Sequence, residues 1–207
     1  MRLVISDKCL GLVEAVGDHL ISDVLWINPK RVDVRSVDAA TGELRWTTAT
    51  PYSGNLPGGL SGLASDGETL FVAGYAPDGG AAERDGKLDA YPAAGCGEDA
   101  CSPAWTATFG EGAVASTAPA VAGGVVYAGL GAGLSNHPAV VAVDAAGCGS
   151  TTCDELNRVD LVTSSGPTVM GSAPTQLSVG SGRVFVDWLP GLHGTALSQL
   201  VALAPST

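Results

Sequence analysis

Residues 32–46 read VDVRSVDAATGELRW, and this stretch decides the fold. Residues 32–35 alternate between apolar and polar side chains, which is the two-residue period of a half-buried β-strand. The Asp-Ala-Ala-Thr-Gly run that follows is typical of a tight turn. A short strand ending in Trp46 comes after the turn. The stretch therefore predicts two antiparallel strands joined by a turn.

The same order of parts recurs along the chain. Related segments are 63–74 with 86–95, 118–129 with 140–147, and 173–179 with 182–187 and 200–204. Each unit predicts a four-stranded antiparallel meander, at a spacing of roughly 50 to 60 residues. One such sheet leaves a face uncovered on its own, so the units must pack face to face, radially in a propeller or in a stacked array. We expect one all-β domain over 1–207, with units near 10–50, 57–109, 115–162 and 171–207.

Composition supports this fold class. The chain has 207 residues, of which 45% are hydrophobic and 15% charged, with 29 Gly and 12 Pro. This composition is ample for a packed core and points to many turns rather than helices. A net charge of -11 without a compensating Lys/Arg cluster argues against nucleic acid and anionic membrane surfaces as partners. The sequence contains no run of 18 apolar residues, so no membrane-spanning helix is predicted. The N-terminus lacks a signal-peptide pattern.

Four cysteines form two matching pairs, Cys96 with Cys101 and Cys148 with Cys153, each preceded by Ala-Ala-Gly. Four intervening residues can form a hairpin loop that places the flanking cysteines opposite each other, as a disulfide requires. Disulfides persist in oxidising compartments, so we expect an extracellular or cell-surface protein whose leader peptide is not in this chain. Zinc binding is the alternative, although the histidines lie far from both pairs in sequence: His19, His137 and His193.

The order of strands and turns in each unit resembles the PQQ-like propeller repeat, in which a strand followed by Asp-Ala-x-Thr-Gly-x-x-x-Trp recurs once per blade. Residues 37–46 fit that motif, 118–129 match the opening strands of a blade, and the cysteine-braced form is similar to repeats of exported actinobacterial proteins. The resemblance implies a β-propeller, usually of seven or eight blades. Because this chain holds about four, we favour a fragment of a longer exported protein. The alternatives are that residues 1–6 complete the last blade or that two chains associate.

The tryptophans divide into two groups. Trp46 and Trp105 occupy equivalent strands and are expected to pack between neighbouring blades. In the third unit, Asn157 or Val159 stands where this tryptophan would fall. Trp26 and Trp188 lie in or beside predicted loops, so they are candidates for a contact surface. Cys9 has no obvious partner, and we interpret it as a buried thiol or as half of a pair completed by missing sequence.

No catalytic constellation stands out in the sequence. The Gly-x-Ser-x-Gly motif of many hydrolases is absent, and the acidic segment 78–89 lacks the ligand spacing of an EF-hand, so we interpret it as a solvated hairpin loop. The PQQ and Ca²⁺ ligands of quinone-dependent dehydrogenases cannot be placed, so no cofactor is assigned. We expect a non-catalytic binding or scaffold module with a protein or carbohydrate partner. The alternatives are part of a PQQ-dependent oxidoreductase and the sensor portion of a membrane protein.

Overall fold

The computed structural model describes residues 33–38, 40–50, 60–76, 85–98, 100–110, 113–131, 138–161, 173–189 and 199–203. Within these ranges every regular element is a β-strand. The described residues include no helix long and apolar enough to cross a membrane. The strands are β1 (Asp33–Val37), β2 (Leu44–Ala49), β3 (Leu60–Ser65), β4 (Thr69–Ala76), β5 (Asp85–Pro92), β6 (Trp105–Thr108), β7 (Val114–Ala115), β8 (Ala120–Ala122), β9 (Val125–Gly131), β10 (Ala139–Asp144), β11 (Thr152–Cys153), β12 (Asn157–Asp160), β13 (Ala173–Gly180), β14 (Arg183–Leu189) and β15 (Gln199–Leu203).

These strands form four sheets that follow one another along the chain. The first sheet pairs β1 with β2, and the second runs β3-β4-β5-β6 as an antiparallel meander. In the third sheet, β7 and β8 pair with different parts of β9, which is followed by β10 and β12. The fourth sheet is β13-β14-β15. The predicted meander order is thus present in the second and third units.

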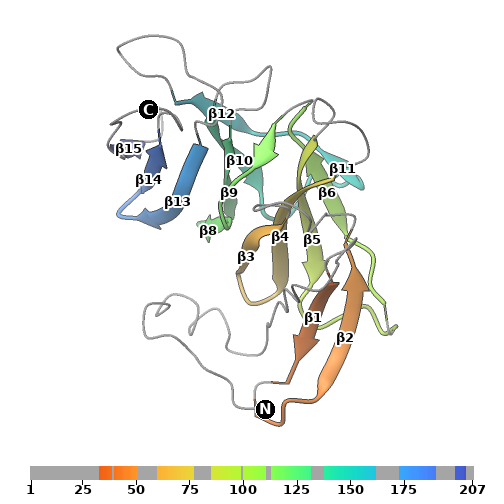
Figure 1. Cartoon of the computed structure of the whole chain (residues 1–207). Helices are drawn as coiled ribbons and strands as arrows, with labels where there is room; N and C mark the ends of the chain where they lie inside the picture. Colours follow the sequence, from red (N-terminus) through yellow and green to blue (C-terminus); the bar gives the residue numbers. More distant parts are fainter. Residues whose placement is uncertain are drawn as a thin grey trace.

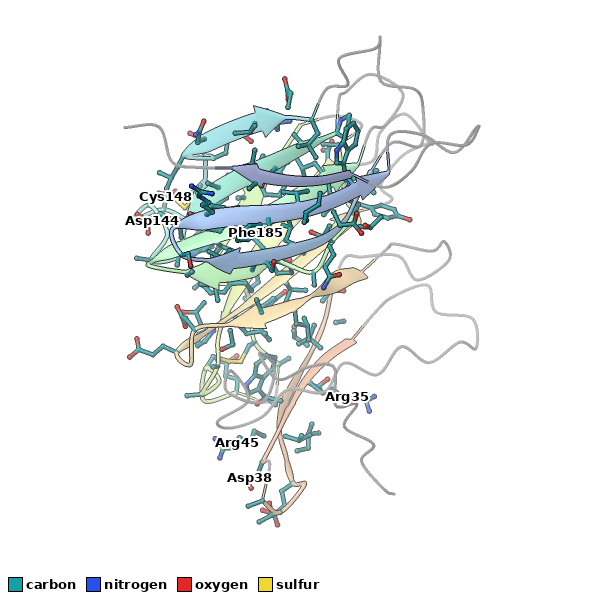
Figure 2. All side chains as sticks on the ribbon, turned by 90° about the vertical axis from the view of Figure 1, so that its left-hand side faces the viewer. Arg35, Asp38, Arg45, Asp144, Cys148 and Phe185 are labelled. Atoms are coloured by element: carbon teal, nitrogen blue, oxygen red, sulfur yellow. A yellow bond between two sulfur atoms is a disulfide. The ribbon has the colours of Figure 1, made fainter. Side chains whose placement is uncertain are left out.

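The four sheets are layered face to face in chain order. The first interface joins the first and second sheets through Val34, Trp46, Leu70 and Tyr91. A larger cluster fills the second interface, between the second and third sheets, and another occupies the third interface, between the third and fourth sheets. Figure 1 shows the progression from β1 and β2 at one end to β13–β15 at the other. Figure 2 shows the same layers from the side, with Arg35, Asp38 and Arg45 on the first sheet and Phe185 on the last.

The turn of the first sheet illustrates how the sequence builds these hairpins. The Asp38 carboxylate accepts hydrogen bonds from the backbone amides of Ala40 and Thr41, each at 2.9 Å, and pairs with Arg45 at 2.8 Å. The Arg45 guanidinium and these amide donors hold the pKa of Asp38 well below its usual range. Gly42 closes the turn with φ of 74°, a conformation that glycine adopts without a steric penalty.

The repeats are equivalent at the level of strand register. In each of the first three units, the residue three places before the first alanine of the turn lies opposite the tryptophan position: Ser36 opposite Trp46, Ala90 opposite Trp105, and Ala142 opposite Asn157. Asn157, and not Val159, therefore occupies the tryptophan position of the third unit. Neither tryptophan ends its strand, because Trp46 is the third residue of β2 and Trp105 the first of β6. The threonine-rich residues that follow each tryptophan continue the strand pairing.

Candidate binding cavity at the third interface

At the first interface, Trp46 packs against the turn of the second unit. The indole is 2% exposed and its Nε1 donates a hydrogen bond to the Ala93 carbonyl at 3.3 Å. Its ring stacks on Tyr91 with 6.2 Å between centroids. Burial, with the nearby Asp89 carboxylate adding to it, raises the pKa of the Tyr91 hydroxyl. The contact with the turn is so close that a Cβ added at Gly95 would lie 2.7 Å from Trp46 Cδ1.

The second interface repeats this arrangement one unit further along the chain. Trp105 is 5% exposed and packs against Phe71, with ring centroids 6.0 Å apart. It also lies on the turn glycine of the next unit, because a Cβ added at Gly147 would come 2.5 Å from Trp105 Cδ1. The Ala-Ala-Gly that precedes each cysteine pair is thus a platform for the tryptophan of the preceding unit.

Both predicted disulfides are confirmed, Cys96–Cys101 and Cys148–Cys153, with Cα atoms 5.7 Å and 5.6 Å apart. The zinc alternative is excluded for these four residues because their sulfur atoms bond each other. The second cysteine of each hairpin is buried. The Cys101 carbonyl accepts a hydrogen bond from Thr48 Oγ1 at 2.6 Å, and β11 pairs in parallel with β6 of the preceding sheet. The two disulfides are consistent with an oxidising, extracellular environment.

Removing one disulfide is expected to destabilise the fold measurably. Replacing Cys148 and Cys153 together by serine should lower the free energy of unfolding by about 2 kcal/mol, because the short cross-linked loop no longer restricts the unfolded chain. Urea denaturation of the oxidised protein and the double variant measures this difference. The same substitutions at Cys96 and Cys101 form the matched comparison, because that loop has the same length. Unchanged unfolding midpoints in both variants would contradict the bracing role of the hairpins.

The third interface differs because its tryptophan position holds Asn157. A cavity of about 610 Å³ lies beside Asn157, between the third and fourth sheets. Its walls include Val184 and Leu203, which lie opposite each other in the fourth sheet. In the second sheet, the pair Leu70 and Tyr91 has the corresponding place beside Trp46. In the third sheet, the corresponding pair beside Trp105 is Val126 and Val143. The cavity thus lies at the register position that an indole occupies at the other two interfaces.

The cavity has apolar walls and a polar rim. Tyr127 and Ala142 belong to the wall formed by the third sheet, and Leu156, 61% exposed, lies at its edge beside Asn157. Among the described lining residues, Arg183 is the one charged side chain. The turn between β13 and β14, residues 181–182, supplies further polar backbone at the rim. This arrangement can hold a flat apolar group with its polar substituent directed toward the rim.

Three further predicted residues have different outcomes. Trp188 is not a contact surface: it lies in β14, is 1% exposed, and belongs to the core of the third interface. The reason is that Val184, Val186 and Trp188 alternate along β14 and share its inward face. Trp26 and Cys9 lie outside the described residues.

The acidic segment 78–89 is only partly a loop. Asp85 and Asp89 belong to β5, and Asp89 is buried and accepts a hydrogen bond from Thr106 Oγ1 at 2.6 Å, while residues 77–84 lie outside the described ranges. Among the described residues, no three His, Cys, Asp or Glu side chains gather closely enough to hold a metal ion.

A spacing in the sequence marks the tryptophan position of the third unit. Trp105 lies four residues after Cys101, and Asn157 lies four residues after Cys153. The distance from the cysteine pair therefore identifies Asn157 as the residue that stands at the tryptophan position of the third unit. Comparison with models of protein families and with curated proteins finds no match to this chain.

Proposed function

We propose that this chain is an extracellular, non-catalytic binding module built from propeller repeats of the PQQ-like type. Three features support the proposal. The units share one strand register, successive sheets pack face to face, and the tryptophan of one unit lies on the Ala-Ala-Gly turn of the next. The two disulfides fit export. The binding role rests on a further observation, the open cavity beside Asn157.

The cavity suits ligand binding because of its size and its composition. Small-molecule sites usually enclose about 300–1,000 Å³, lined mainly by apolar groups with a few polar ones. The cavity at the third interface has about 610 Å³, and its walls follow that description. At the first two interfaces the protein fills the same position with its own side chain, Trp46 or Trp105. An asparagine at the third leaves this space for a group from outside the chain.

Replacing Asn157 by tryptophan should close the cavity and stabilise the protein. Asn157 is exposed on β12, so the larger side chain can enter the open space without displacing core residues. Cavity filling of this kind commonly adds about 0.5–2 kcal/mol to the free energy of unfolding. Urea denaturation of the Asn157→Trp variant measures the gain. The control is Asp160→Trp, which places an indole on the opposite face of the same strand and is expected to add nothing.

A ligand screen with this variant tests the binding role. Thermal unfolding is followed for the unaltered protein and for Asn157→Trp with soluble glycans, aromatic acids, and PQQ with Ca²⁺. A true ligand raises the unfolding temperature of the unaltered protein by mass action and leaves Asn157→Trp unchanged. A screen in which every compound acts alike on both proteins would refute the cavity as a binding site. Dye reduction upon addition of PQQ and Ca²⁺ would favour the oxidoreductase instead.

A further inference from the structure

We propose that the cavity at the third interface binds a flat aromatic ring that carries a carboxylate. This inference rests on the proposed binding function and names the chemical class of the ligand. Its two parts have separate origins in the structure. The ring is argued from the repeated tryptophan position, and the carboxylate from the charge at the rim.

The aromatic part follows from the equivalence of the three interfaces. Trp46 lies against Leu70 and Tyr91, and Trp105 shares its cluster with Val126 and Val143. Val184 and Leu203 have the same register in the fourth sheet, and they line the cavity beside Asn157. The third interface therefore presents apolar lining residues at the register where the first two interfaces hold an indole. An aromatic ring is preferred over a saturated ring because the chain itself places an aromatic ring, Trp46 or Trp105, at the equivalent position of the other two interfaces.

The anionic part follows from Arg183. The protein has a net charge of -11, yet the described residues that line this cavity include an arginine and no carboxylate. Arg183 begins β14, is exposed, and makes no ion pair with any residue that the structure describes. A guanidinium presents a planar set of donors that matches a carboxylate. A ring seated between the sheets would direct its substituent toward this rim, where solvent and Arg183 are both accessible.

Isothermal titration calorimetry with three probes tests the two parts separately. Indole-3-acetate carries both features, indole lacks the carboxylate, and cyclohexylacetate lacks the flat ring. The proteins are the unaltered chain, Asn157→Trp, Arg183→Gln and two controls. Asp160→Trp controls for an added indole on β12, and Arg35→Gln removes one positive charge from the first sheet, far from the cavity (Figure 2).

Indole-3-acetate is expected to bind the unaltered protein more tightly than either other probe. Arg183→Gln should weaken it by about 2- to 5-fold at low salt and leave indole unchanged, since the interaction is solvent-exposed. Asn157→Trp should weaken both indole probes on the order of 10-fold or more, because its side chain occupies the space. Both controls should bind like the unaltered protein.

Several results would overturn the inference. Equal binding of cyclohexylacetate removes the aromatic requirement, and equal effects of Arg183→Gln and Arg35→Gln remove the local anion site. Undiminished binding to Asn157→Trp places the ligand elsewhere. If no probe binds while a glycan from the screen stabilises the unaltered protein and not Asn157→Trp, this inference fails and the binding function stands. If neither probes nor screen give a cavity-dependent response, both fail.

Discussion

Replacing Gly147 by alanine is expected to lower the free energy of unfolding by about 3 kcal/mol. Two effects combine at this position. Gly147 has φ of 79°, where an L-residue costs roughly 1–2 kcal/mol. The added Cβ would also lie 2.5 Å from Cδ1 of Trp105. That ring is buried in the second interface and cannot turn aside, so overpacking adds about 1–3 kcal/mol.

Gly149 provides a matched control in the same hairpin. It has φ of 76°, and a Cβ there meets no atom within 4 Å. Gly149→Ala should therefore lower the free energy of unfolding only by the cost of a positive φ for an L-residue, about 1–2 kcal/mol. Urea denaturation of the two variants gives the difference, which measures the contact with the tryptophan. In a Trp105→Phe background the smaller ring should reduce that difference, and a double-mutant cycle reports the coupling. Equal losses for Gly147→Ala and Gly149→Ala would refute the platform role.

The second unit offers the same pair, Gly95 with φ of 90° and Gly97 with φ of 81°. An alanine at Gly95 would press on Trp46, whereas one at Gly97 meets no atom within 4 Å. If the repeats are energetically as well as geometrically equivalent, Gly95→Ala should lower the free energy of unfolding more than Gly97→Ala does, by a margin similar to that between Gly147→Ala and Gly149→Ala. Such agreement would show that the Ala-Ala-Gly sequence is retained in both units for the tryptophan contact.

Much of this fold could be predicted because its information is local in sequence. Alternation over 32–35, the glycine turns and the paired cysteines each act within a few residues of the backbone they shape. The prediction that Trp188 belongs to a contact surface in or beside a loop is wrong, because this residue lies in β14 and is buried. The inward face shared by Val184, Val186 and Trp188 is the stronger signal, and it was available in the sequence.

Other features depend on contacts between units and leave little trace in sequence. The parallel pairing of β11 with β6 joins residues 152–153 to 106–107 across two units, and no local pattern specifies it. The burial of Asp89 likewise depends on the Thr106 hydroxyl that the neighbouring strand supplies. The cavity is a further case, because an asparagine in one strand indicates a space only when the opposite sheet is known.

Truncating Trp105 to alanine is expected to be the most destabilising single change, at about 3–5 kcal/mol. The indole occupies the central interface and contacts both sheets, with Phe71 on its own sheet and Gly147 on the next. Removing it leaves a void in a rigid stack, whose sheets are held by backbone pairing and cannot collapse fully onto the space. A loss of this size is a large fraction of the roughly 5–15 kcal/mol that stabilises a typical domain.

Asn157→Ala is the matched control for this change, because Asn157 has the same register in the next unit. It should alter the free energy of unfolding by less than about 0.5 kcal/mol, since its side chain is exposed at the cavity and not packed into a core. Urea denaturation at one fixed pH compares the two variants with the unaltered protein. A loss below about 1 kcal/mol for Trp105→Ala would mean that the sheets are not held together by these tryptophans. The cavity at Asn157 would then lose its interpretation as an unfilled tryptophan position, because the occupied positions would themselves contribute little.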